Sequence, residues 1–195
     1  MKTVISILLI GLVSVAYAQK IKITQGSLSP LKGQTELNCE FTYDNMSVGK
    51  FDKEEDYVSD RRNKMNEKEA GTGDKWADGW INDRTDRYMP KFYELFNRDG
   101  SLSAGEKPNA KYTMIFHTTF TEPGFNVGVM RKPAFINAEV TIVETSNKSN
   151  VVCVITIANA PGSGAMGYDF DTGFRIQECY AVCGKRLIAQ INKAK

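Results

Sequence analysis

Histidine is scarce in this chain of 195 residues, and its scarcity limits the catalytic sites that the protein can build. A Ser-His-Asp or Cys-His site would have to use His117, the single imidazole, as the base beside its nucleophile. His117 lies in KYTMIFHTTF, which alternates like a strand, and no G-x-S-x-G turn lies nearby. We therefore interpret His117 as an exposed or capped strand histidine, and we assign no catalytic residue.

Metal-ligand patterns are missing as well. No paired C-x-x-C motif occurs, and one histidine cannot complete a zinc site. The segment LFNRDGSLSAGE resembles a calcium loop in spacing, but Leu95 occupies the first position, where the loop needs a carboxylate. We predict a helix end followed by a turn in this segment, with no metal and no cofactor.

An excess of charge of one sign is also absent, with 25 basic and 23 acidic residues. The two kinds alternate through residues 50–100, so no basic stripe indicates nucleic-acid binding. Beyond the amino-terminal segment no apolar run is long enough to span a bilayer.

The first eighteen residues, MKTVISILLIGLVSVAYA, have the features of a signal peptide. Lys2 gives a basic start, an apolar stretch follows over 4–15, and 16–18 form a small-x-small cleavage site. We expect cleavage between Ala18 and Gln19 and a soluble periplasmic or secreted product, with an amino-terminal anchor or buried helix as the alternative. Because glutamine and not cysteine follows the cleavage site, the lipid anchor of a bacterial lipoprotein has no attachment point.

The four cysteines, Cys39, Cys153, Cys179 and Cys183, allow three disulfide pairings in an exported chain. Cys179 and Cys183 lie four residues apart in a predicted helix and form a core stripe with Ile176, Leu187 and Ile191. The other two cysteines alternate with apolar neighbours in predicted strands. We favour buried free thiols, because cysteine packs well as a small hydrophobe, and a disulfide stays the alternative.

The order of predicted elements indicates one α+β domain over 36–195, after an extended leader at 19–35. ELNCEFTYDNMSV has the period of a strand with one buried face, and a long helical excursion follows over 52–97. Trp76 and Trp80 fall on one face of that excursion and are expected in the core, and Pro90 should kink or restart the helix.

Three strands and a closing helix complete the predicted order β-α-β-β-β-α. KYTMIFHTTF places Tyr112, Met114, Phe116, Thr118 and Phe120 on one face, and AFINAEVTIVET alternates in the same way. NVVCVITIA is apolar on both faces, as a central strand would be, and the polar turn SNKSN before it indicates an antiparallel hairpin. A helix from Gly173 to Lys193 follows with Thr172 as its cap. We predict a single mixed or antiparallel sheet packed against the helical excursion and the carboxy-terminal helix.

Gly162, Gly164 and Gly167 spell G-x-G-x-x-G, the fingerprint of a dinucleotide-binding turn. Asp169 and Asp171 would lie where a phosphate needs positive potential. Only 28 residues follow Gly167, enough for one helix but not for the second strand of the nucleotide fold. We predict a flexible strand-to-helix connection without a nucleotide.

The segment TEPGFNVGVMRKPAF offers a candidate partner-binding site at Phe125, Val127, Val129 and Met130. As the tip of a projecting hairpin, these side chains would form an exposed apolar patch. As extensions of the flanking strands they would be ordinary core, an interpretation that their strand-like alternation favours.

Three segments carry a resemblance to known proteins: DKWADGWINDRTDRYMPKFYELFN, YTMIFHTTFTEPGFNVGVMRKPA and GYDFDTGFRIQECYAVCGKRL. Together they resemble a group of small exported proteins of unassigned function from Bacteroidetes, and this resemblance implies no activity. The element order is similar to the amino-terminal domain of TolB and to related envelope lipoproteins such as the curli-secretion protein. That similarity implies protein contacts in the cell envelope, and the missing lipid-bearing cysteine is a departure from it.

Two functions are compatible with the sequence. The one we favour is an exported, soluble, non-catalytic cell-envelope protein that binds a protein partner or supports an assembly, and not a nucleic acid. The alternative is a small extracytoplasmic hydrolase or ligand carrier with a site near His117 and the pair Asp169/Asp171. The partner and the oligomeric state are left open.

Overall fold

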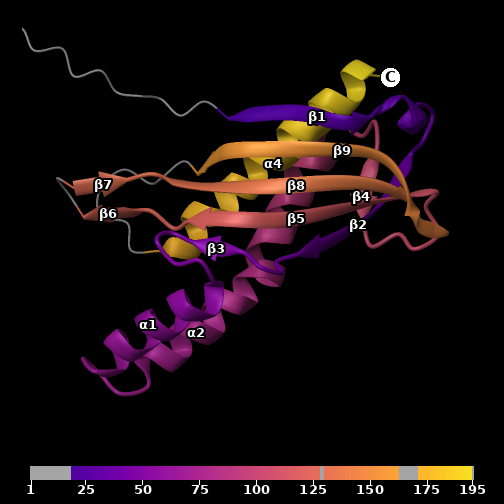
Figure 1. Ribbon diagram of the computed structural model, residues 1–195. Coiled ribbons are helices and arrows are strands. Elements are labelled where there is room, and N and C mark those ends of the chain that lie inside the picture. Colours follow the sequence, from indigo (N-terminus) through magenta and orange to yellow (C-terminus); the bar gives the residue numbers. More distant parts are fainter. Residues whose placement is uncertain (1–18, 128–129, 163–170, 195) are drawn as a thin grey trace, which may run out of the picture.

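A mixed sheet of seven strands, with helices on one face, organises the protein (Figure 1). The computed structural model describes residues 19–127, 130–162 and 171–194. The main sheet contains β1 (Lys20–Gly26), β2 (Glu36–Thr42), β3 (Ser47–Val48), β4 (Ser103–Gly105), β5 (Tyr112–Glu122), β8 (Ala134–Glu144) and β9 (Asn147–Gly162). β6 (Phe125–Val127) and β7 (Met130–Lys132) form a separate two-stranded sheet.

The strand order is β1-β9-β8-β5-β2-β4, and β3 pairs with the far end of β5. In this order β1, β9, β8 and β5 pair antiparallel with one another in turn, whereas β2 runs parallel to both β5 and β4. The predicted fold class, an α+β domain with a mixed sheet, is therefore confirmed, and so is the antiparallel hairpin of β8 and β9.

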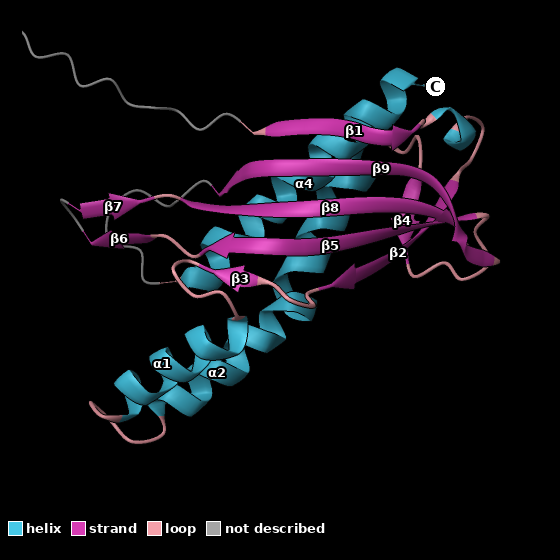
Figure 2. Ribbon diagram, viewed as in Figure 1, coloured by secondary structure: helices cyan, strands magenta, loops and turns pink. Residues whose placement is uncertain are grey.

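The helices are α1 (Glu54–Asn66), α2 (Thr72–Asp83), the π-helical turn η2 (Arg84–Tyr88), α3 (Met89–Phe96) and α4 (Thr172–Ala194), with short 3₁₀ turns η1 (Ser29–Leu31) and η3 (Asn97–Asp99). Figure 2 shows α4 lying across one face of the sheet, whereas α1 and α2 project away from it as a helical hairpin, here called the arm. Pro90 stands at the start of α3, so the helix restarts there after η2, as the sequence predicted.

The core lies between the sheet and the helices α3 and α4. Residues of α4 spaced by three or four contribute the predicted buried stripe: Ile176, Cys179, Cys183, Leu187 and Ile191. Phe92 and Phe116 meet edge to face at 5.5 Å, and burying such a ring stabilises the fold by about 1.5–3 kcal/mol. Gly184 lets the α3 and α4 backbones approach, because a Cβ there would collide with the Phe92 carbonyl. All four cysteines are buried free thiols.

The segment 19–35, expected as a leader outside the domain, is part of the fold. β1 pairs antiparallel with β9, and Leu28 and Leu31 are buried in the core. In KIKIT, Ile21 packs against the helix-covered side while the lysines face solvent, so the short alternation marks an edge strand.

Two further predictions about strands were wrong in detail. Phe120 does not share the buried face of Phe116, because a bulge between Thr118 and Phe120 turns it to the uncovered face, where it contacts Phe135 at 5.4 Å. β9 is a central strand between β1 and β8, as predicted, but only one of its faces is fully buried, and it continues through Asn159, which has a positive φ of 54°, to Gly162.

Candidate functional site

The β6–β7 hairpin extends beyond the main sheet at the end where β5 and β8 meet (Figure 1). Pro123 and Gly124 connect β5 to it, and Gly124 has a φ of 62°, a conformation that glycine adopts without strain. A Cβ at Gly124 would lie 2.5 Å from the Lys132 carbonyl, so the two hairpin strands approach closely at their base. The hairpin therefore leaves the sheet through a tightly defined turn.

Arg175 on the first turns of α4 holds this base. Its side chain is only 4% exposed, and its Nε donates to the Pro123 carbonyl at 3.1 Å. A second guanidinium nitrogen donates to the Gly124 carbonyl at 3.3 Å and to the Thr172 hydroxyl at 3.1 Å. A planar guanidinium with several donors is well suited to fix two successive carbonyls. The α4 amino terminus and the hairpin are thus joined across fifty residues of sequence.

Glu122 supports the turn from the β5 side. One carboxylate oxygen accepts from the Gly124 amide at 3.1 Å, and the other pairs with the Lys132 Nζ at 2.6 Å. The Glu122 side chain is buried, so these charge-assisted contacts tie β7 to the end of β5.

Large apolar side chains are exposed at this end of the molecule. Phe125 is 42% exposed and Met130 is 62% exposed, so the interpretation of these two residues as core is wrong. Phe174, next to Arg175 on α4, is 38% exposed and was missed from the sequence. The Val127 side chain and Val129 lie outside the described residues. We call Phe125, Met130 and Phe174 the apolar end.

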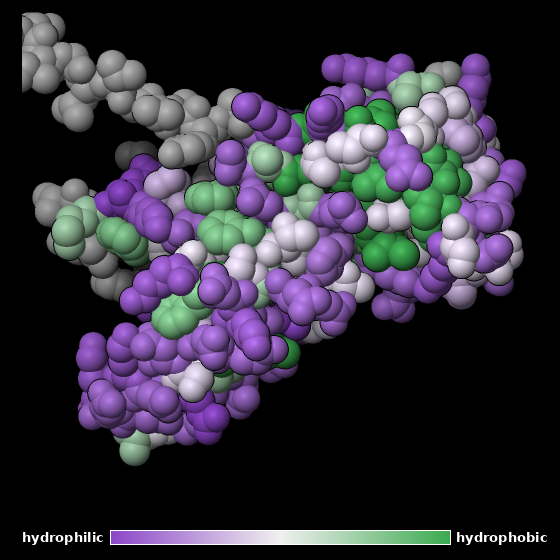
Figure 3. All heavy atoms as spheres, viewed as in Figure 1, coloured by the Kyte–Doolittle hydropathy of each residue, from purple (hydrophilic) through white to green (hydrophobic). Residues whose placement is uncertain are grey.

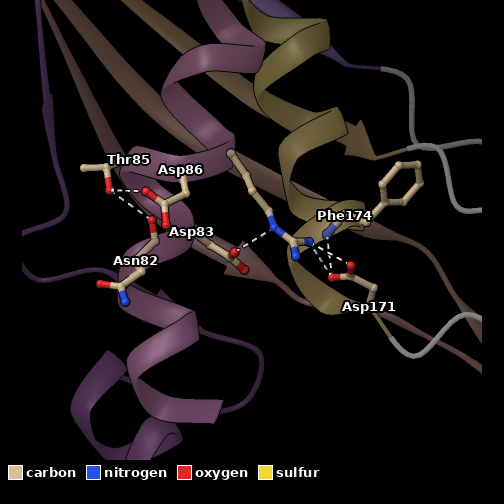
Figure 4. Close-up of polar contacts among 7 residues, drawn as sticks. Asn82, Asp83, Thr85, Asp86, Asp171 and Phe174 are labelled. Carbon is tan, nitrogen blue, oxygen red and sulfur yellow. Dashed lines mark hydrogen bonds and ion pairs between the residues drawn. The ribbon is translucent and has the colours of Figure 1, made fainter. Parts of the chain in front are cut away.

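A charged cluster fixes the amino terminus of α4 (Figure 4). The Asp171 carboxylate accepts a hydrogen bond from the Phe174 amide at 2.9 Å, so Asp171 caps the helix. The prediction of Thr172 as the cap was wrong. Arg87 from η2 pairs with Asp171 at 2.7 Å and with Asp83 at 2.9 Å. The π-helical turn is thereby attached to the start of α4.

The pKa values of Asp83 and Asp171 in this cluster shift in opposite directions. Burial raises the pKa of Asp83 although Arg87 lies beside it. Burial acts in the same sense on Asp171, but hydrogen bonds from Arg87 and the Phe174 amide outweigh it and lower the pKa of that carboxyl. Asp171 is therefore a structural anion, and its contacts explain its position without a ligand.

The two described residues of the alternative hydrolase or carrier site, His117 and Asp171, do not meet. His117 points to the uncovered face of the sheet and hydrogen-bonds the Thr42 hydroxyl at 2.9 Å through Nδ1. Its neighbour Thr118 points to the helix side and bonds the Tyr180 hydroxyl of α4 at 2.7 Å. Asp171 caps α4 on the helix-covered side of the sheet, so the sheet separates it from His117. Asp169 lies outside the described residues.

The strand that leads into the glycine-rich segment has antiparallel neighbours. β9 carries Gly162 and lies between β8 and β1, both antiparallel to it, whereas a dinucleotide-binding turn joins parallel strands. Gly164 and Gly167 fall outside the described residues. In the calcium-like segment, Asn97 bonds both the amide and the carbonyl of Ala104, so the predicted helix end and turn are confirmed. The described residues contain no group of three or more potential metal ligands.

A depression of about 690 Å³ lies where the arm joins the sheet. At its wall Glu54 pairs with Arg84 at 2.5 Å and accepts from the Trp80 indole at 2.6 Å. Arg84 also lies over the Tyr43 ring, 4.1 Å from its centre. Glu54 and Arg84 neutralise each other, and their contacts with Trp80 and Tyr43 fix the base of the arm against the sheet. Trp80 is buried and Trp76 partly buried, as predicted.

None of the helices in the described part of the chain combines the length and apolarity that a bilayer crossing requires.

Comparison with known proteins gives no family for this chain. No protein-family model matches it, and no curated protein matches it. Among solved structures, it is similar to the PelC dodecamer of Paraburkholderia phytofirmans, with 10% identity and a TM-score of 0.40 over 91% of this chain and 99% of that one. A DUF330 protein from Xanthomonas campestris shows 10% identity and a TM-score of 0.40 over 82% and 85% of the two chains. Similarity at this level does not inform the function, and the resemblance to Bacteroidetes proteins and to TolB stays a prediction.

Proposed function

We propose that the chain is an exported, soluble, non-catalytic cell-envelope protein that binds a protein partner, or supports an assembly, through its apolar end. The observation that carries this proposal is the exposure of Phe125 and Met130 on a hairpin whose base is fixed by the buried Arg175. Exposed large apolar side chains that cluster at one place are typical of protein–protein contacts.

The fixed base supports a binding role for thermodynamic reasons. Ordering a loop on binding reduces affinity, and a hairpin held before the encounter avoids much of that loss. Arg175 and the Glu122–Lys132 pair hold the hairpin on both sides, while their own charged groups stay engaged at its base. The exposed apolar atoms are then available to a partner surface.

Export is supported by the sequence of the first eighteen residues, and glutamine at position 19 leaves no attachment point for the lipid anchor of a bacterial lipoprotein. The test is the intact mass of the protein purified from the cell envelope. A mass that begins at Gln19 supports export with cleavage after Ala18, and a mass that includes residue 1 in a cytoplasmic fraction contradicts it.

Site-specific photo-crosslinking in cells tests the contact. A photo-reactive phenylalanine analogue replaces Phe125 in one variant and Met130 in a second. In a matched control it replaces Ile81, an apolar arm residue that is 46% exposed. We expect a discrete adduct of the same mass from positions 125 and 130 and not from 81. Identical adduct patterns from all three positions, or none at 125 and 130, would contradict the proposal.

A further inference from the structure

A second surface, at the β1 edge of the sheet, has the chemistry of an anion-binding site. β1 is an edge strand that pairs only with β9 among the described strands. Between β1 and the carboxy-terminal half of α4 lies a depression of about 420 Å³. Gln19, Lys20, Arg186 and Lys193 contribute to its lining, and none of the described residues that line it carries a carboxylate.

Among the described residues, the three cations of this depression have no acidic partner. Elsewhere arginines and lysines pair with carboxylates, as Arg87 does with Asp171. Within the described ranges, no carboxylate lies within 4 Å of the charged nitrogens of Lys20, Arg186 or Lys193. The sequence explains this, because neither 19–35 nor 179–194 contains an aspartate or glutamate. The positive potential of the depression is therefore not neutralised locally.

The fold brings these cations together from distant parts of the chain. Arg186 and Lys193 lie seven residues apart on α4, and hence on one face of the helix, which adjoins β1 at this depression. The guanidinium of Arg186 donates to the Gln19 carbonyl at 3.4 Å, which uses one of its five N–H donors. Lys20 follows directly on β1 with its side chain on the solvent side, so it contributes positive charge at the rim of the depression.

Gln19 supplies an unsatisfied polar group at the same place. Its side chain is 7% exposed, and its Oε1 has no hydrogen-bond partner within the described residues. Its Nε2 makes only a 4.0 Å contact with the Cys183 sulfur. Rotation of the amide exchanges the two atoms, so Gln19 can present either an acceptor or a donor. Buried amides of this kind usually have a partner.

We propose that this depression, formed by Lys20, Arg186, Lys193 and Gln19, binds a phosphate-type oxyanion. The Arg186 guanidinium can bind two oxygens of such an anion side by side, and the two lysines add positive charge. The anion is either free phosphate or the phosphate of a lipid headgroup, which present the same chemistry. This inference is independent of the apolar end.

The first test is a titration of the purified protein with inorganic phosphate at constant ionic strength, followed by two-dimensional amide NMR. We expect saturable shifts for the side-chain amide of Gln19, for the Lys20 amide and for the amides around Arg186. Arg186→Gln should weaken binding by at least about tenfold, because it removes the bidentate contact. Lys193→Gln provides a second variant, and it should also weaken binding.

Lys185→Gln is the matched control, because Lys185 is exposed beside Arg186 but does not line the depression. Lys185→Gln makes the same change in net charge but removes no group that lines the depression. It should therefore alter the affinity for phosphate less than about twofold. Equal losses in all three variants would show diffuse electrostatic attraction and overturn the proposal.

Sedimentation with phosphatidylglycerol vesicles, with phosphatidylcholine vesicles as the neutral reference, distinguishes the source of the phosphate. Binding of free phosphate that depends on Arg186 assigns a soluble anion. Binding only to phosphatidylglycerol, lost in Arg186→Gln and kept in Lys185→Gln, assigns a lipid headgroup. Binding to neither contradicts the inference.

Discussion

Two parts of the molecule project from the main sheet, and they differ in the side chains that they expose. The β6–β7 hairpin carries Phe125 and Met130 into solvent. The arm of α1 and α2 also projects, but its surface is mostly hydrophilic (Figure 3). No residue of α1 is buried, and the arm includes exposed ion pairs such as Arg62 with Asp74. The exposed surface of the arm is therefore mainly charged.

The anchors of the two projections are more alike than their surfaces. Arg175 holds the hairpin through backbone carbonyls, and Arg84 holds the arm through Glu54 and the Tyr43 ring. Projection from the body is therefore not a sign of binding by itself, since both segments are fixed in the same way. The exposed apolar chemistry is what singles out the hairpin as the interface.

Arg175→Leu should have the largest effect on stability. The substitution leaves the Pro123 and Gly124 carbonyls without their donor in a buried place, at a cost on the order of 3 kcal/mol in the free energy of unfolding. Urea denaturation measures it, with Arg131→Leu on the exposed strand β7 as the control, for which we expect less than about 0.5 kcal/mol. Equal losses in both variants would show that Arg175 is not an anchor.

Glu54→Gln should have the next largest effect, because it removes the charge from the partly buried pair with Arg84. We expect a loss of about 1–2 kcal/mol and a changed Trp80 fluorescence, since Glu54 accepts from that indole. Asp74→Asn breaks the exposed pair with Arg62 and should cost below about 0.5 kcal/mol. A Glu54 variant with unchanged stability and fluorescence would mean that the arm is held by packing alone.

Asp171→Asn tests the amino terminus of α4 with a smaller expected effect. Asparagine can still cap a helix, so the variant loses mainly the half-exposed ion pair with Arg87, worth roughly 0.5 kcal/mol.

The pH dependence of this difference has a defined sign. The pKa of Asp171 is lowered in the folded state, so its contribution is present above the unfolded pKa of about 3.9 and is lost as pH falls through the lower folded pKa. The wild type and Asp171→Asn should therefore differ at neutral pH and converge in acid. Asp78→Asn, at an exposed arm residue, serves as the control. A difference that grows in acid would contradict the assignment.

Much of the fold follows from local periodicity. The spacing of Ile176, Cys179 and Cys183 predicted the buried stripe of α4, and the alternation of β8 predicted its buried face, because these patterns depend on neighbours in sequence. The bulge that turns Phe120 outward does not follow, since it depends on how β5 pairs with β8. The pairing of β1 with β9, more than a hundred residues away, is not visible in the leader either.

The candidate site was predictable only in the part that depends on neighbours in sequence. The apolar run bounded by Pro123 and Pro133 indicated Phe125 and Met130, but alternation alone could not separate an exposed hairpin from a core strand. Arg175 and Phe174 were missed because their role depends on contact with a turn fifty residues away. One signal was available: Arg175 lies four residues before Cys179, so a charged group falls on the buried stripe.

The smallest effect on stability is expected from matched substitutions on the β6–β7 hairpin and on the arm. Phe125→Ser on the hairpin and Ile81→Ser on the arm remove apolar side chains that are 42% and 46% exposed. Each should change the free energy of unfolding by less than about 0.5 kcal/mol, because half-exposed side chains contribute little to the core. The affinity for the partner found by crosslinking should nevertheless fall by at least about tenfold for Phe125→Ser and stay unchanged for Ile81→Ser, since anchors in an interface dominate its energy. Equal losses would make the arm part of the interface. A loss only for Ile81→Ser would reverse the assignment of the two projections.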